Sequence, residues 1–296
     1  MSGVIPWFRL EGLWIPLPTS TIEIGGLRFE PPSGFAIQPF GLLVATGVMV
    51  GVLLAKRRAQ AQGIHPEAVA GAGGYVLLSA FIFAHWVEIL AYRPEVLLSD
   101  PFCMLRIWEG LSSFGGFIGS VLGLLCYARR FSVDARVVGD PIAWAFPFGW
   151  FFGRLGCFVV HDHPGRPTDF FLGVRDYEVG SPPYVTRHDL GLYEAFWALG
   201  ASILFAWLVL QKRPIGFFLA LLPLIYAPVR FFLDFLRATD VPGADPRYFG
   251  LTPAQYGAVA LELSGVLLWR SVHRNPPSIP AFLVIPPPSE SPQARA

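Results

Sequence analysis

The sequence predicts an all-α polytopic membrane protein with about seven transmembrane helices. Two features of its composition support this fold class: 53% of the 296 residues are hydrophobic and only 15% are charged, whereas soluble domains are roughly one quarter charged. A third observation is that the apolar residues gather in stretches close to the roughly 20 residues that a helix needs to cross a bilayer. A bilayer is therefore the expected solvent for most of the chain.

Seven stretches are apolar enough to form membrane-embedded helices. Their ranges are 35–55, 68–92, 113–128, 138–158, 190–210, 215–236 and 253–269. Several contain closely spaced glycines, as in Gly115, Gly116 and Gly119, and small residues allow helix backbones to approach one another closely in a membrane. We therefore expect the seven segments to pack as one bundle.

The positions of lysine and arginine predict the orientation in the membrane. Basic clusters follow the first, third, fifth and seventh segments, and their members are Lys56, Arg57, Arg58, Arg129, Arg130, Arg136, Lys212, Arg213, Arg270 and Arg274. Short basic loops stay on the cytoplasmic side of a membrane. The N-terminus is therefore expected outside the cytoplasm and the C-terminus inside it.

This orientation divides the chain into three parts. Residues 1–34 form an N-terminal segment on the non-cytoplasmic side, and residues 35–270 form the membrane domain, with a small insertion at about 159–189 on the same side as the N-terminus. The cytoplasmic tail, 271–296, is rich in proline and has no helical or strand periodicity, so we predict that it is disordered. The first thirty residues lack a basic start followed by an unbroken apolar run, which argues against a cleaved signal peptide.

The composition also argues against several function classes. The net charge is +1 and the basic residues lie in short clusters, which indicates no nucleic-acid partner. Cys103, Cys126 and Cys157 are far apart and form no metal-binding spacing, so we interpret them as small buried residues. We find no repeated half of the kind that many transporters have, so a transporter function has little support.

Three of the ionisable residues inside the apolar stretches suggest a site. Arg154 lies in FFGRLGCF, and Arg230 and Asp234 lie four residues apart in YAPVRFFLDFLR, so these two share a helix face and can pair. Charges inside a membrane usually face a cavity or a partner. Two arginines and one acid would form a net positive site that suits a lipid phosphate. The alternatives are a purely structural ion pair and an Arg154 side chain that reaches the headgroup layer.

Other polar residues have simpler interpretations. His85 and Glu88 are three apart and are suited to hydrogen bonds between helices. The His-Asp-His cluster at 161–163 has no further ligand at a recognisable spacing, so a polar loop is favoured over a metal site. Tyr193 and Glu194 open the fifth segment, where aromatic-belt and capping residues are common.

Five motifs together resemble the prolipoprotein diacylglyceryl transferase family. FFGRLGCFVVHDHPGR is similar to a family signature in which Gly-Arg-Leu-Gly-Asn-Phe is followed by an acid and then by Gly-Arg. RHDLGLYEA, YAPVRFFLDFLR, LTPAQYGA and WEGLSSFGGFIGS are similar to four further family motifs. Each motif alone is weak, but the five occur in the family's order between about residues 36 and 270.

The resemblance implies a multi-pass enzyme of the bacterial inner membrane, whose insertion faces the periplasm. It implies transfer of the diacylglyceryl group of phosphatidylglycerol to the thiol of the lipobox cysteine in a preprolipoprotein, with release of glycerol phosphate. The implied partners are phosphatidylglycerol, the lipobox segment and the lipid bilayer, and no metal or cofactor is implied. This chemistry needs a cation to hold the leaving phosphate and a base, or a positive field, to favour the thiolate.

The matching positions imply roles for individual residues. Arg154 and Arg230 would hold the phosphate, and Asp234 would orient Arg230, which makes these three the catalytic candidates. The implied substrate-binding positions are Tyr226, Gly165, Cys157, Asp162, His188 and Glu194, of which His188 and Glu194 match the family's structural or gating positions.

The chain also departs from the family pattern. The histidine of Ser-Phe-His-Gly-Gly is absent or replaced by Phe114, while Cys157 and Val160 stand where the signature has asparagines. Asp162 replaces the signature glutamate, and Phe40 replaces a tyrosine of the first helix. The missing histidine is the family's assigned general base, and such a base contributes about 10²–10⁴-fold to a rate.

A substitute base is therefore needed if the chain is an enzyme. His161 is a candidate from the insertion and His85 from within the bundle. Cys157 is a different kind of candidate, a nucleophile of its own, because the nearby positive charge of Arg154 favours its thiolate. Two functions stay open from the sequence: a divergent diacylglyceryl transferase, and a non-enzymatic relative that binds phosphatidylglycerol or lipoproteins through the same arginines.

Overall fold

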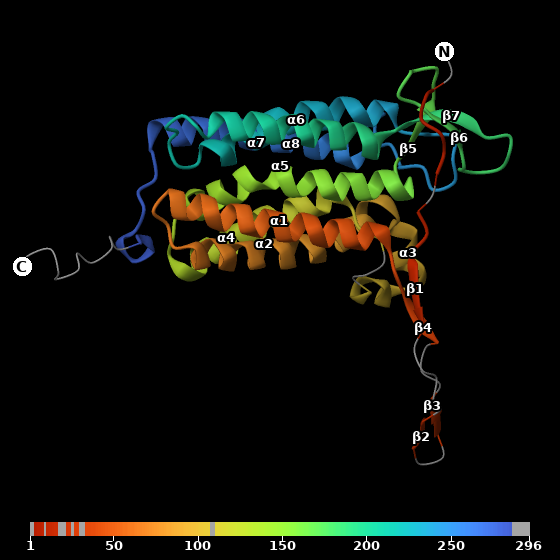
Figure 1. Cartoon of the computed structure of the whole chain (residues 1–296), viewed down its shortest axis with the longest axis horizontal. Helices are drawn as coiled ribbons and strands as arrows, with labels where there is room; N and C mark the ends of the chain where they lie inside the picture. Colours follow the sequence, from red (N-terminus) through yellow and green to blue (C-terminus); the bar gives the residue numbers. More distant parts are fainter. Residues whose placement is uncertain are drawn as a thin grey trace, which may run out of the picture.

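The computed structural model describes residues 3–8, 10–16, 22–24, 27–29, 33–106 and 110–285. Seven long helices lie side by side in one bundle (Figure 1). They are Pro39–Ala61 (α1), Pro66–Val87 (α2), Ser113–Phe131 (α4), Ala135–Val160 (α5), Leu190–Leu208 (α6), Phe217–Leu233 (α7) and Pro253–Arg274 (α8). A short helix, Pro94–Ser99 (α3), lies in the connection between α2 and α4.

Five of these helices are long and apolar enough to cross a membrane, namely α1, α2, α5, α6 and α7. In that count α2 continues through a π-helical turn to Tyr92, and α7 continues through a 3₁₀ turn to Leu236. The other two long helices, α4 and α8, have 19 and 22 residues, and α8 carries Glu262, Arg270 and Arg274. The protein is therefore a largely helical, multi-pass membrane protein.

Small sheets lie at one end of the bundle (Figure 1). Leu13–Pro16 (β1) pairs antiparallel with Gly34–Ile37 (β4), from Leu13 opposite Ile37 to Pro16 opposite Gly34, and Ile22–Ile24 (β2) pairs with Leu27–Phe29 (β3). The insertion between α5 and α6 folds as a three-stranded antiparallel sheet in the order β5-β7-β6. Its strands are Pro164–Pro167 (β5), Val174–Tyr177 (β6) and Val185–Asp189 (β7). We refer to this end as the sheet end of the bundle.

Side-chain caps set where the helices begin. Asp134 accepts a hydrogen bond from the N–H of Arg136 at the start of α5, and Asp189 accepts one from Leu192 at the start of α6. Thr252 and Gln255 form a reciprocal capping box at the start of α8. Asp140, fully buried within α5, accepts from the N–H groups of Phe218 and Leu219 at the start of α7. These contacts satisfy backbone donors that a helix leaves unpaired.

Glycines allow the closest helix pairs to form. Gly115, Gly119 and Gly123 recur every fourth residue along α4 and face the backbone of α2. A Cβ atom on Gly119 would lie 2.7 Å from the carbonyl carbon of Ser79 and 2.8 Å from Cα of Ala80. The predicted close packing through small residues is thus present between α2 and α4.

The tail is the part of the fold where the sequence prediction is wrong. We expected disorder from residue 271, but α8 continues to Arg274, and Ile279 and Leu283 pack against the apolar core between α1 and α2. The carbonyl of Leu283 accepts a hydrogen bond from the N–H of His65 at 2.9 Å. Apolar side chains between the prolines supply this contact. The rest of the predicted tail, 286–296, lies outside the described residues, as do Trp108 and Glu109 of the WEGLSSF motif.

Replacing Gly119 with leucine should destabilise the bundle, because the new side chain meets the backbone of α2. Overpacking of this kind costs about 1–3 kcal/mol, and the thermal unfolding midpoint in detergent should fall. Gly74→Leu is the matched control, because a Cβ atom on Gly74 meets nothing within 4 Å. Equal unfolding midpoints for the two variants would contradict the packing argument.

Candidate active site

Three buried charges from three helices meet at the sheet end of the bundle. Arg154 of α5, Glu194 of α6 and Arg230 of α7 are 3%, 1% and 6% exposed. Nε of Arg154 lies 2.9 Å from Oε2 of Glu194, and Nε of Arg230 lies 3.9 Å from Oε1 of the same carboxylate. Glu194 therefore bridges two arginines that lie 76 positions apart in the sequence.

Asp234 anchors the second arginine. Its Oδ1 pairs with Nη1 of Arg230 and lies 3.1 Å from Nε of Arg237, and its Oδ2 accepts a hydrogen bond from the hydroxyl of Thr252. Arg237 pairs in turn with Asp245 at 3.0 Å. The predicted pairing of Arg230 with Asp234 is present. The hydrogen bond from Thr252 to Asp234 links the end of α7 to the residue before α8.

The expectation of a net positive set of two arginines and one acid needs correction. The sequence suggested a capping or belt role for Glu194, but the structure buries its carboxylate between the two arginines. With this second acid, Arg154 and Arg230 are balanced by Glu194 and Asp234. The sequence could not give Glu194 this role, because its partners come from two other helices.

Arg154 nevertheless keeps an unused donor. Its Nη2 atom is buried and has no hydrogen-bond partner in the described part of the chain. The guanidinium plane also lies against the ring of Trp150, with Cζ 4.4 Å from the ring centroid, a favourable cation-aromatic contact. A buried donor without a partner is costly, so this atom is suited to an anionic ligand.

Tyr226 belongs to the same network. Its hydroxyl donates to Oε2 of Glu194 at 2.9 Å. Its ring lies 5.2 Å from that of Phe117 and 4.8 Å from that of Trp197, measured between centroids. Tyr226 therefore borders both the charged cluster and an apolar region.

An apolar cavity of about 310 Å³ opens beside this cluster. It lies between α4, α7 and α8, and its lining includes Phe114, Phe117, Ile118, Tyr226, Gly257 and Leu261. A smaller cavity of about 60 Å³ is lined by polar residues, among them Tyr92, Ser112, His163 and Arg237. Ser113 and Arg230 line both cavities. The arrangement can receive a molecule with an anionic part at Arg230 and an apolar part between the helices.

Phe114, at the point where the motif histidine is absent or replaced, lines the apolar cavity. Its ring packs against α8 at Gly257, where any Cβ atom would overlap it; the distance from that Cβ atom to Phe114 Cζ would be 2.6 Å. Phe114 is therefore an apolar wall and provides no proton acceptor.

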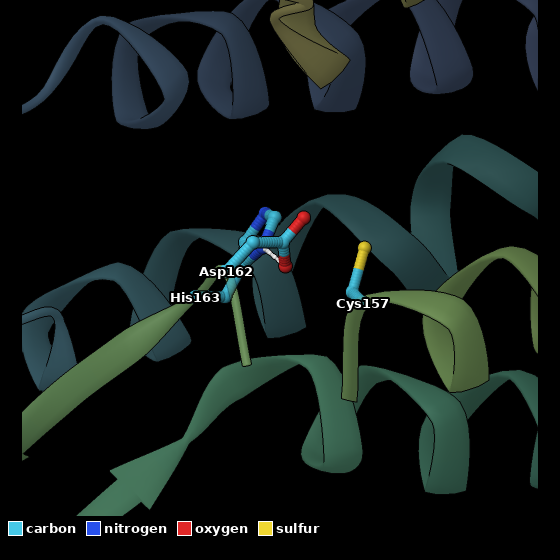
Figure 2. Close-up of side chains that lie close together, drawn as sticks. All are labelled: Cys157, Asp162 and His163. Carbon is cyan, nitrogen blue, oxygen red and sulfur yellow. Dashed lines mark hydrogen bonds and ion pairs between the residues drawn. The ribbon is translucent and has the colours of Figure 1, made fainter. Parts of the chain in front are cut away.

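His163 is the site residue that the sequence reasoning missed. Its Nε2 lies 3.2 Å from Nη1 of Arg154, and its Nδ1 is hydrogen-bonded to Oδ1 of Asp162. Figure 2 shows Asp162 and His163 side by side, with the sulfur of Cys157 directed toward the same space. Burial lowers the pKa of His163, but Asp162 and Cys157 outweigh it and raise the pKa to about 9. The sequence signal that could have identified His163 is its position directly after Asp162, the acid of the signature motif.

Cys157, Asp162 and His163 offer ligand atoms that all lie within 4.8 Å of one another, a spacing that would suit a metal ion. However, Nη1 of Arg154 lies 3.2 Å from Nε2 of His163 and 3.8 Å from Sγ of Cys157. Arginine stays protonated in proteins. A permanent cation thus occupies the position from which a metal would contact both atoms, so we do not interpret this cluster as a metal centre.

The two histidines expected as substitute bases hold the fold together instead. Nδ1 of His161 lies 2.8 Å from Oδ2 of Asp189, and its Nε2 lies 2.8 Å from the carbonyl oxygen of Phe8. The ring nitrogens of His85 lie 2.9 and 3.3 Å from the carbonyl oxygens of Cys103 and Gly110. Both histidines use both ring nitrogens in these contacts.

Gly165 and His188 also have packing roles. A Cβ atom on Gly165 would lie 2.9 Å from the carbonyl oxygens of both His188 and Leu236, so glycine lets β5 lie between β7 and the end of α7. Nδ1 of His188 lies 2.8 Å from the hydroxyl of Tyr193, and burial lowers the pKa of His188. These two residues position the insertion against the bundle.

The fold and the site together define a class of protein: a multi-pass membrane protein with a buried arginine pair beside an apolar cavity. A sequence model of the family described as prolipoprotein diacylglyceryl transferase matches residues 29–270. The chain belongs to this family, which confirms the resemblance carried by the five motifs.

Individual relatives agree with this assignment. Proteins named phosphatidylglycerol-prolipoprotein diacylglyceryl transferase from Chromohalobacter salexigens and Nitrosomonas europaea are 30% and 31% identical to this chain. These matches cover 82% and 79% of this chain and 90% and 84% of the relatives. The protein of that name from Nitratidesulfovibrio vulgaris is 33% identical, over 84% of this chain and 90% of its own length.

Replacing Glu194 with glutamine should destabilise the protein, because it removes the negative charge that Arg154 and Arg230 share. Loss of one partner from a buried ion pair costs about 3–5 kcal/mol. The thermal unfolding midpoint in detergent should fall well below that of Glu178→Gln, a substitution of an exposed glutamate in the insertion. A Glu194→Gln variant as stable as this control would show that Glu194 is not the shared counter-ion.

Proposed function

We propose that this protein transfers the diacylglyceryl group of phosphatidylglycerol to the lipobox cysteine of a preprolipoprotein. The observation that carries the proposal is the position of Arg230 at the junction of a polar and an apolar cavity. A diacyl phospholipid has its phosphate at the same kind of junction, between an anionic head and apolar chains. Family membership supports the same activity.

Arg154 and Arg230 would bind the phosphate together. The unused Nη2 donor of Arg154 is buried, and charge-assisted hydrogen bonds from arginine to phosphate are short and strong. Glu194 and Asp234 would hold the two guanidinium groups in place before the lipid arrives. Such prearranged donors stabilise the charge that develops on a leaving phosphate.

The apolar cavity would hold the part of the lipid next to the reacting carbon. It is about 310 Å³ in volume, which accommodates part of an acyl chain, with the remainder in the surrounding bilayer. The small residues Ala254, Gly257 and Ala258 of α8 line one wall. This wall leaves space between α8 and α4, whose ends near the site are both helix N-termini.

The reaction would be a substitution at the glyceryl carbon. The acceptor thiolate forms a carbon-sulfur bond as the bond from carbon to the phosphate oxygen breaks. Glycerol phosphate leaves with the electron pair, and its added negative charge falls on the oxygens held by the arginines. The thiol proton passes to a base, so the step needs no oxidant or reductant.

The membrane orientation follows from the same proposal. We place the sheet end, with β5–β7 and the N-terminus, in the periplasm, and the C-terminus in the cytoplasm of a bacterial cell, with all seven long helices crossing the inner membrane. The supporting observation is the alternation of basic loops, which puts Arg129 and Arg130 at the opposite end from the site.

Replacing Arg154 or Arg230 with glutamine should lower the transfer rate about 10²–10³-fold, the loss expected for one donor to a developing anion. The assay is transfer from labelled phosphatidylglycerol to a lipobox peptide by the purified protein in lipid nanodiscs. Arg129→Gln, an exposed arginine at the other end of the bundle, should leave the rate unchanged.

The same assay tests the non-enzymatic alternative, which the missing motif histidine favours. Phosphatidylglycerol binding that depends on Arg154 and Arg230, without transfer by the unmodified protein, would contradict the transferase proposal and support a lipid-binding role.

The orientation can be tested by labelling in intact cells. In a background whose three cysteines are replaced by serine, a membrane-impermeant maleimide should react with Glu178→Cys, in the insertion, because we place it in the periplasm. Arg130→Cys should react only after the cells are permeabilised. The reverse pattern would overturn the proposed orientation.

A further inference from the structure

The hydrogen bonds of His163 define which of its ring nitrogens can act as a proton acceptor. Arginine has only donors and an ionised carboxylate has only acceptors. In the neutral imidazole, Nδ1–H therefore donates to Asp162, and the lone pair of Nε2 faces Nη1 of Arg154 at 3.2 Å. A carboxylate on one nitrogen and an acceptor lone pair on the other is the arrangement of a general base, once the contact of that lone pair with Arg154 is released.

We propose that His163, oriented by Asp162, is the general base that takes the proton from the acceptor thiol. This inference rests on the transferase function proposed above. It assigns the task to the loop between α5 and β5, away from α4, where the family motif carries its histidine and this chain has Phe114.

The surroundings of His163 give a substrate access to it. Its side chain is 18% exposed, and it lines the polar cavity together with Tyr92, Ser113 and Arg230. A thiol that enters this cavity is close to the base and to the arginine expected to hold the phosphate. Proximity of base, nucleophile and leaving group is the geometric requirement for the substitution.

The contact with Arg154 links lipid binding to the availability of the base. Nε2 of His163 accepts from the same guanidinium that would bind the lipid phosphate. When the phosphate engages Arg154, one of its donors turns toward the phosphate, and Nε2 is released to face the thiol. The base is thus exposed in the complex with the lipid, where thiolate formation leads to transfer.

The proton balance of the step is complete. Nε2 of His163 takes the proton from the thiol sulfur, and the thiolate forms the carbon-sulfur bond while glycerol phosphate leaves with the electrons of the broken carbon-oxygen bond. The imidazolium is stabilised by Asp162, and it then returns the proton to the departing phosphate or to water. The same stabilisation raises the pKa of His163 to about 9, so the neutral form that acts as the base is the minor form at neutral pH.

The other described histidines near the sheet end do not fit this role. Both ring nitrogens of His161 and of His85 contact oxygen acceptors, namely backbone carbonyls or Asp189, whereas Nε2 of His163 faces a donor. His188 is bonded to Tyr193 and lines neither cavity. His65, which is exposed at the start of α2 and away from the site, is a suitable control residue.

The test compares His163→Gln and His163→Ala with His65→Gln in the nanodisc transfer assay. We expect both His163 variants to lose about 10²–10⁴-fold in transfer rate and to bind phosphatidylglycerol as the unmodified protein does. Added imidazole should restore part of the rate in His163→Ala, whose side chain leaves space for it, and should not change the rate of His163→Gln. His65→Gln should keep its transfer rate.

The outcomes separate this inference from the function on which it rests. If the unmodified protein and His163→Gln transfer at equal rates, the base assignment is overturned and the transferase function is not. The base assignment is also overturned if His163→Ala loses both its transfer rate and its lipid binding and imidazole restores neither. That result would show that His163 has a structural role. No transfer by the unmodified protein overturns both proposals.

Discussion

Glu194 holds together three helices, two of which bring a buried cation to the same end of the bundle. Its carboxylate contacts Arg154 of α5 and Arg230 of α7, and it accepts a hydrogen bond from Tyr226. A buried charge without a partner is strongly destabilising, so the three helices have to meet in this register. The cavities, the position of the insertion and the geometry of the arginines all depend on that meeting point.

The sequence predicted the elements that depend on local composition. Apolar length located the seven long helices of the described residues to within about six residues at each end, because a bilayer requires long apolar runs. Helix α5 begins at Ala135 instead of 138 because Asp134 caps it. The sequence also identified Arg154, Arg230 and Asp234, because charged residues are costly inside apolar membrane segments and usually face a partner or a cavity. The packed residues up to Ile285 were not predicted, because the contact of Leu283 depends on the distant segment before α2.

The remainder of the site depended on tertiary structure. Glu194 looks like an ordinary residue at a helix start until α5 and α7 place arginines beside it. His163 contacts Arg154 because the chain reverses at His161, whose φ of 52° is in the left-handed region, a conformation that the sequence gives little reason to expect of a histidine. The two histidines that looked most available, His85 and His161, are engaged in contacts between distant segments that no local pattern reveals.

The N-terminal segment has a consequence for biogenesis. Ile5 forms a β-bridge with Val174, Trp7 stacks on His161, and Phe8 accepts a hydrogen bond from the same ring. Residues 5–8 therefore find these partners only after residues 161–174 have been synthesised. Docking of this segment on the insertion thus follows synthesis of the intervening helices α1, α2, α4 and α5.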